Sequence, residues 1–145
     1  MARRAAKKEL LIPSDLSGVR GASQKVLSFL KPLSPDEAFI FDVRLCLEEA
    51  LINAMKYGNR LQKELPVRLT VEVDEKKVRI TIEDQGEGFD AGRLQDCTKG
   101  DNLLKGGGRG IYLIHQLMDE VKYNSKGNCL SMTKRFRKAR RMRAK

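Results

Sequence analysis

Apolar residues recur at helical spacing in three parts of the chain. One stripe at steps of three and four residues predicts a long helix, formed by Ile40, Val43, Leu47, Leu51 and Ala54. A capping Ser34, a proline at position 35 and two acidic residues mark its start, and Gly58 with Asn59 marks its end. This helix is the clearest element that the sequence predicts.

Two shorter helices are predicted on either side of it. The first follows a cap at Ser14 or Asp15 and has an apolar side made of Val26, Leu27, Phe29 and Leu30. The second opens at Ile111 and buries Ile111, Ile114, Leu117 and Met118. Just before the helix at Ile111 lies a polar, glycine-rich stretch over 86–110. It is too long for an ordinary connection and is therefore expected to be functional.

Alternating apolar and polar residues predict the strands of one sheet. Residues 9–13 form a short edge strand, residues 67–73 and 78–82 form a hairpin, and residues 119–124 and 128–136 form a last pair around Gly127. We therefore predict an α+β fold: a two-layer α/β sandwich whose mainly antiparallel mixed sheet is covered on one face by helices.

The length of 145 residues suffices for one domain with a core. We expect a single domain over 1–145, with its core at about 9–136 and a basic tail at 134–145. No apolar run approaches the ~20 residues that cross a bilayer, so we expect a cytoplasmic protein without membrane contact. Three separated cysteines and a lone His115 show no metal-ligand spacing, so a metal would have to come with a bound ligand.

The net charge of +10 is located at the two ends of the chain. Residues 134–145 carry eight basic residues and no acidic one, residues 1–8 carry four basic residues, and the stretch between them is slightly acidic. Such a tail contacts an acidic partner, RNA or a membrane surface in some proteins and is simply solvated in others. Because no interleaved aromatic residues accompany the tail, we regard direct nucleic-acid binding as unlikely.

The first candidate for chemistry lies on the long helix. Glu49, Asn53, Lys56 and Tyr57 follow one another at helical steps, away from the apolar stripe. A carboxylate, an amide and an ammonium aligned there could act as base, magnesium ligand and phosphate contact, since Mg²⁺ takes oxygen ligands and shares its shell with phosphates. The alternative is the ordinary solvent-facing side of an amphipathic helix.

The second candidate is Asp84-Gln85-Gly86-Glu87-Gly88. Asp84 continues the alternation of the preceding strand, so its carboxylate points toward the core side, where it needs a hydrogen-bond donor. An adenine amino group is such a donor, and Gly86 and Gly88 would let a flat ring approach the backbone. The alternative is a strand end at which Asp84 caps nearby backbone amides.

The third candidate is the run from Lys105 through Gly108 and Arg109 to Gly110, just before the helix at Ile111. Consecutive glycines at a helix N-terminus expose backbone N–H groups, which suits a phosphate chain. The run matches neither a Walker motif nor a dinucleotide fingerprint. A flexible loop would explain it singly, whereas the three candidates together favour a nucleotide site.

At these residues the chain resembles the Bergerat-fold ATPase superfamily, which includes gyrase, a heat-shock chaperone, histidine kinases and mismatch-repair ATPases. It most resembles the anti-sigma-factor serine kinases, over residues 10–136. The motif E-x-x-x-N-A-x-x-H-G is matched by Glu49, Asn53, Ala54 and Gly58, and D-x-G-x-G by Asp84, Gly86 and Gly88. The late G-x-G motif is matched by Gly108, Gly110 and the following Ile111. Departures are Tyr57 for the histidine, Asn128 for a late threonine, and no arginine just before the G-x-G.

The resemblance implies the roles of these residues. Glu49 would be the general base, Asn53 would hold Mg²⁺, and Asp84 would recognise the adenine of ATP. Lys56, Lys105, Gly108, Arg109 and Gly110 would lie along the phosphates, beneath a lid at roughly residues 95–107. The implied partners are a sigma factor and a STAS-type anti-anti-sigma protein that is phosphorylated on serine, and the implied assembly is a homodimer. Two alternatives are a nucleotide-gated binding module without kinase activity and a histidine-kinase-type ATPase domain.

Overall fold

The computed structural model describes residues 5–33, 36–86, 106–124 and 127–136. In chain order its elements are β1 (Ala6–Ile12), α1 (Val19–Leu30), α2 (Glu37–Asn53), β2 (Val67–Val73), β3 (Lys77–Glu83), α4 (Gly106–Leu117), β4 (Glu120–Tyr123) and β5 (Cys129–Arg135). Short 3₁₀ turns cover Leu16–Gly18 and Lys31–Leu33, and a π-helical turn covers Ala54–Gly58.

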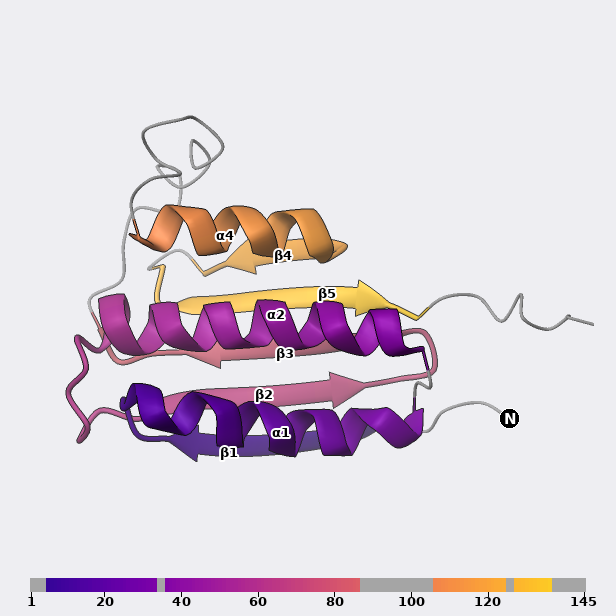
Figure 1. The fold of residues 1–145 in the computed structure, drawn as a ribbon, viewed down its shortest axis with the longest axis horizontal. Coiled ribbons are helices and arrows are strands. Elements are labelled where there is room, and N and C mark those ends of the chain that lie inside the picture. The colour runs from indigo at the N-terminus through magenta and orange to yellow at the C-terminus, as the bar shows by residue number, and fades with distance from the viewer. Residues whose placement is uncertain (1–4, 34–35, 87–105, 125–126, 137–145) are drawn as a thin grey trace, which may run out of the picture.

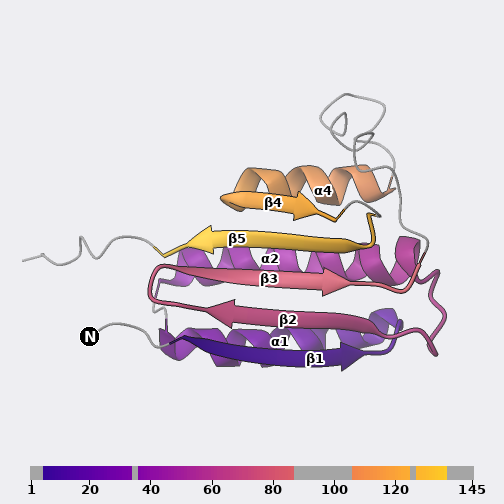
Figure 2. The same cartoon turned by 180° about the vertical axis from the view of Figure 1, so that it is seen from behind.

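The strands form one sheet in the order β1-β2-β3-β5-β4, and every pairing among the described residues is antiparallel. β3 lies at the centre, paired with β2 on one side and β5 on the other, as Figure 2 shows. The predicted strands are thus confirmed, with β1 extended toward the N-terminus to Ala6.

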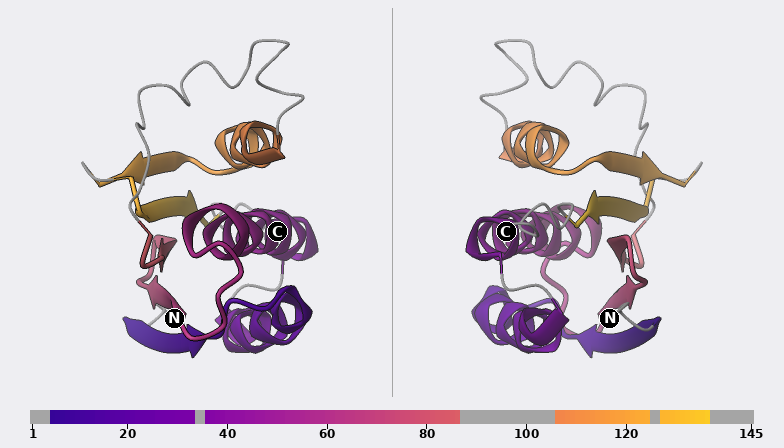
Figure 3. Two further views of the ribbon diagram at one scale, coloured as in Figure 1. Left: turned by 90° about the vertical axis from the view of Figure 1, so that its left-hand side faces the viewer. Right: turned by 90° about the vertical axis from the view of Figure 1, so that its right-hand side faces the viewer.

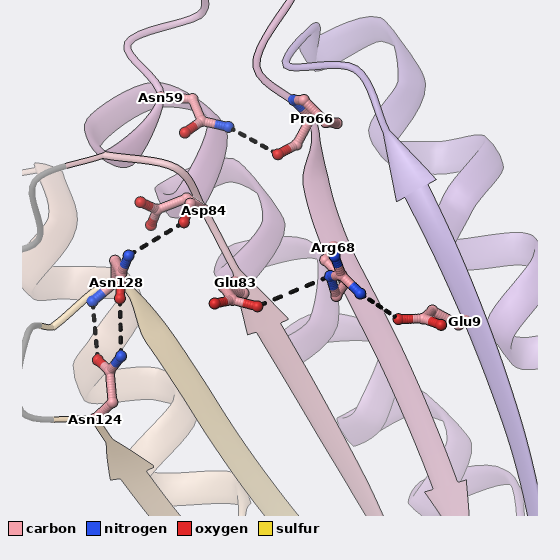
Figure 4. A network of polar contacts seen from close by, with 8 residues as sticks. All are labelled: Glu9, Asn59, Pro66, Arg68, Glu83, Asp84, Asn124 and Asn128. Carbon is pink, nitrogen blue, oxygen red and sulfur yellow. Dashed lines mark hydrogen bonds and ion pairs between the residues drawn. The ribbon is translucent and has the colours of Figure 1, made fainter.

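The three helices cover one face of this sheet and leave the other face exposed (Figures 1 and 3). On β2, buried Val67, Leu69, Val71 and Val73 alternate with more exposed residues, and they face the helices across the core. The open face carries paired charges instead: Arg68 lies 3.0 Å from Glu9 of β1 and 3.9 Å from Glu83 of β3 (Figure 4). The α+β sandwich predicted from the sequence is confirmed.

The long helix begins two residues later than a Ser34 cap would require. Asp36 is the N-cap, and its carboxylate accepts hydrogen bonds from the backbone N–H groups of Ala38 and Phe39. The predicted cap at Ser34 lies outside the described residues. The register of the buried stripe also differs, because Phe39 is 2% exposed and Ile40 only partly buried.

Lys134 ties the last strand to two helices at one end of the core. Its Nζ donates a hydrogen bond to the carbonyl oxygen of Leu117, at the end of α4, over 2.8 Å. The same ammonium lies 3.6 Å from Asp42 of α2 and over the Phe39 ring. Beside it the Cys46 thiol is buried, and this burial, together with the Asp42 carboxylate, raises its pKa to about 12.

Two consecutive residues after the π-helical turn adopt the left-handed backbone conformation. Arg60 has φ 53° and Leu61 has φ 58°, and the Leu61 N–H donates to the carbonyl oxygen of Met55. A side chain costs about 1–2 kcal/mol in this conformation, because Cβ crowds the following carbonyl. The end of α2 is therefore held in place at a local energetic cost.

Arg60→Gly is expected to stabilise the protein by about 0.5–1 kcal/mol, because the relief of crowding exceeds the extra chain entropy of glycine. The midpoint temperature of thermal unfolding should then rise by about 2–4 °C. The matched control is Lys25→Gly on an exposed position of α1, which should lower the midpoint, since glycine weakens a helix interior by about 1 kcal/mol. An unchanged or lower midpoint for Arg60→Gly would show that the left-handed pair costs nothing.

Among the described residues, no helix has both the length and the hydrophobicity needed to cross a membrane.

Candidate functional site

Three chain segments with candidate residues meet at one end of the sandwich. There α2 ends in the π-helical turn, β3 ends just before Asp84, and α4 begins, as seen on the left of Figure 1. In the sequence these segments are separated by about 20 residues or more. The fold therefore places the predicted helix face, the strand-end acid and the glycine turn on the same side of the molecule.

Glu49 and Asn53 face the first turns of α4 across a very short gap. A Cβ added at Gly110 would lie 2.5 Å from Oε1 of Glu49 and 3.2 Å from Nδ2 of Asn53. Because real Cβ atoms do not approach so closely, only glycine fits at position 110 without displacing the acid. The carboxylate and the amide are thus adjacent, one helical turn apart, at the same point on α4.

The amide of Asn53 is free to take a ligand. Its Nδ2 atom is buried and has no hydrogen-bond partner among the described residues. Buried polar atoms almost always find a partner, and Nδ2 is a hydrogen-bond donor, so the partner that suits it is an acceptor such as a phosphate oxygen. Within the described ranges no three His, Cys, Asp or Glu side chains are placed to hold a metal ion. Asn53 could hold Mg²⁺ only through Oδ1 of its amide, since that ion takes oxygen ligands and shares its shell with phosphates.

Asp84 and Gly86 pack against Gly58, the last residue of the π-helical turn that follows α2. A Cβ added at Gly58 would collide with the Asp84 carboxylate, and one added at Gly86 would collide with the Gly58 carbonyl oxygen. Oδ1 of Asp84 accepts a hydrogen bond from the Gly86 N–H over 2.8 Å. The local capping that the sequence left open is therefore present, on a carboxylate that also faces the end of α2.

Asn128 anchors the backbone of Asp84 from the side of β5. The Asp84 N–H donates to the Asn128 carbonyl oxygen over 2.9 Å, and Nδ2 of Asn128 donates to the Asp84 carbonyl oxygen over 3.3 Å. Asn124 in turn donates to Oδ1 of Asn128 over 2.8 Å, as Figure 4 shows. The asparagine that stands for the family's threonine thus supports the turn at Asp84.

The helix at the glycine run begins earlier than predicted. α4 starts at Gly106 and not at Ile111, so Gly106, Gly108 and Gly110 belong to its first turns. The sequence-based assignment of a loop before the helix is wrong there, because neighbouring glycines tolerate a helical backbone when the following segment packs on the sheet. The first N–H groups of a helix have no partner within it, and with the start at Gly106 this set includes the N–H of Gly108 but no longer that of Gly110.

The other predicted residues are placed as follows. Lys56 is exposed, with its Nζ 5.5 Å from the centre of the Tyr57 ring. Gly88, Lys105 and lid residues 95–105 lie outside the described residues, as does the side chain of Arg109. His115 is exposed on α4, as expected for a surface histidine.

One buried residue next to the site was missed by the sequence analysis. Asn59, which the sequence predicts as a helix end, is 1% exposed and bonds four separate backbone or side-chain groups. Asparagine after a helix-terminal glycine is common at exposed turns, so its position alone does not reveal its burial.

Comparison with known proteins gives the family. The histidine kinase-like ATPase domain family matches residues 12–134. The chain belongs to this family. It is also 34% identical over 107 residues to proteins named serine-protein kinase RsbW from Staphylococcus aureus strains MSSA476 and JH9, which is 68% of this chain and 67% of theirs. These matches place the chain among the anti-sigma-factor serine kinases, as its motifs predicted.

A solved structure of the RsbU and RsbW domains of a Mycobacterium tuberculosis protein is similar in fold. It matches with a TM-score of 0.62 and 14% identity over 91% of this chain, which spans about a third (32%) of that longer chain. At this identity the likeness shows the fold alone. Together with the family, it confirms the Bergerat-type fold, and the relatives confirm ATP-dependent serine kinases as the enzyme class of the family branch.

Proposed function

We propose that this chain uses ATP and Mg²⁺ to phosphorylate a serine on a STAS-type anti-anti-sigma protein, and that it also binds a sigma factor. We further infer that it acts in the cytoplasm, as a single domain that forms a homodimer. The observation that carries the proposal is the close approach of Glu49 and Asn53 to Gly110. A base and an amide are thereby brought to the start of a helix whose N–H groups can bind phosphate.

In this proposal one set of residues binds the adenine of ATP and another set binds its phosphates. Asp84 accepts a hydrogen bond from the adenine amino group, and Gly86 and Gly88 border the ring. Gly108, Arg109 and Gly110 lie along the phosphates, with Lys56 and Lys105 adding positive charge. Asn53 would hold the Mg²⁺, which neutralises charge that builds on the phosphates during transfer.

In the transfer itself, Glu49 accepts the proton of the substrate serine hydroxyl. The serine oxygen forms a bond to the γ-phosphorus while the bond from that phosphorus to the β,γ-bridging oxygen breaks, so ADP leaves and phosphoserine remains. Phosphoryl transfer requires mainly positioning and charge neutralisation, and one carboxylate is the only acid–base group that the step needs.

The test is incubation of the purified chain with Mg²⁺, γ-labelled ATP and the anti-anti-sigma proteins encoded next to it. We expect label on one serine of one of these proteins, and its loss when a chelator removes Mg²⁺. ATP labelled at the α-phosphate is the matched control, since its label stays on ADP. ATP-dependent retention of a partner without any labelled serine would contradict the kinase proposal and indicate a nucleotide-gated binding module.

A further inference from the structure

Asn59 is buried at the junction of four chain segments beside the proposed base site. It follows the π-helical turn directly, and its side chain reaches the loop after β1, the residues just before β2 and the residue after Asp84. At 1% exposure it is among the few buried polar side chains of the described core. Such a residue needs a hydrogen-bond partner for each of its polar atoms.

Its amide satisfies that need in only one orientation. Oδ1 accepts from the Gln85 backbone N–H over 2.7 Å, while Nδ2 donates to Oγ of Ser14 over 2.9 Å and to the Leu65 carbonyl oxygen over 2.8 Å. Figure 4 shows a further contact of Nδ2, with the carbonyl oxygen of Pro66 at 3.3 Å. Because carbonyl oxygens only accept and the Gln85 N–H only donates, a flipped amide would lose bonds on both sides.

The bond to Gln85 acts on the base side of the proposed site. Gln85 lies between Asp84 and Gly86, so Asn59 fixes the middle of the turn that is proposed to contact adenine. The preceding residue, Gly58, contacts the Asp84 carboxylate directly. Asn59 thus holds the backbone of the turn, and Gly58 packs against the carboxylate of Asp84.

We propose that Asn59 is a positioning residue that sets the preference for adenine by fixing the turn over 84–86. The proposal rests on the proposed function, since it assigns a support to the same base site. Among the side-chain partners that the described residues give Asn59, Gln85 belongs to the turn of the proposed base site, and none lies on α4 or on the turn of α2 that carries Glu49. Loss of Asn59 should therefore weaken recognition of the base and leave the transfer step itself intact.

The first experiment measures steady-state kinetics of Asn59→Ala with ATP and with GTP. We expect KM for ATP to rise about tenfold to a hundredfold, in line with the loss of a buried hydrogen bond, and kcat to stay within about twofold. The preference for ATP over GTP should fall by a similar factor. The matched control is Ser14→Ala, which removes a partner of the same amide but leaves the bond to Gln85 and should keep both KM and the nucleotide preference.

A second measurement on the unaltered protein does not depend on whether a variant folds. Gln85 has an exposed side chain, yet its amide hydrogen should exchange with solvent at least about tenfold more slowly than an unbonded amide, because Asn59 accepts it. Exchange at the unprotected rate would overturn the proposal.

The kinetic outcomes separate this inference from the proposed function. If the unaltered protein neither binds ATP nor transfers phosphate, the proposed kinase function is overturned. Exchange of the Gln85 amide hydrogen then still tests whether Asn59 fixes the turn. An active unaltered protein with unchanged KM and nucleotide preference in Asn59→Ala overturns the positioning role alone. Equal KM increases in Asn59→Ala and Ser14→Ala overturn it too, because general loosening of the junction would then explain both.

Discussion

Replacing Glu49 by glutamine is expected to slow phosphate transfer by about 10²- to 10⁴-fold, the usual contribution of a general base. Glutamine keeps the shape of the side chain beside Gly110 but cannot accept the serine proton. ATP affinity should stay within about threefold, because the proposed contacts to adenine and the phosphates are made by other groups. Single-turnover transfer from labelled ATP measures the first quantity, and calorimetric titration measures the second.

Glu48 supplies the matched control for this substitution. It is the neighbouring acid on α2, also partly buried, and it pairs with Arg44 over 3.4 Å. Glu48→Gln should leave the transfer rate unchanged, since surface ion pairs of this kind contribute little. If Glu49→Gln transferred phosphate at the rate of the unaltered protein, Glu49 would not be the base.

Gly86→Ala is expected to weaken ATP binding by about tenfold to a hundredfold. The added Cβ would collide with the Gly58 carbonyl oxygen and lie 2.8 Å from its carbonyl carbon, and both are backbone atoms that cannot rotate away. The end of α2 and the turn at Asp84 must then separate, and overpacking of this kind costs about 1–3 kcal/mol. Calorimetric titration with ATP measures the loss of affinity.

The matched control for Gly86→Ala is Gly21→Ala on α1. A Cβ added at Gly21 meets nothing within 4 Å, and alanine is the better helix former there by about 1 kcal/mol. The control should be as stable as the unaltered protein or more stable, with the same ATP affinity. Full ATP affinity in Gly86→Ala would contradict the close approach of Gly58 and Gly86 on which the base site depends.

The elements with strong periodicity could be predicted from the sequence, and their boundaries less well. The alternation in β2 and β3 fixed their inward faces, because one face of each strand packs on the helices. Because glycines carry no apolar signal, the sequence predicts the start of α4 at Ile111, whereas the helix extends back to Gly106. At α2 two residues, Ser34 and Asp36, both favour a helix cap, and sequence alone does not decide between them.

Sequence motifs point to the residues of the candidate site. No motif points to Asn59, which holds the turn next to them. Glu49, Asn53 and Asp84 carry chemistry that their spacing makes visible. The contacts of Asn59 come from residues 14, 65, 66 and 85, which only the folded chain brings together. Long-range partners of this kind leave no local pattern.

Cys46 allows opening of the core to be measured without an engineered label. A thiol that is fully buried and holds its proton at neutral pH does not react with alkylating reagents, since the thiolate is the nucleophile. Alkylation of Cys46 thus requires α2 to lift from the sheet. Its rate reports how often that opening occurs, and a ligand held between α2 and α4 would slow it.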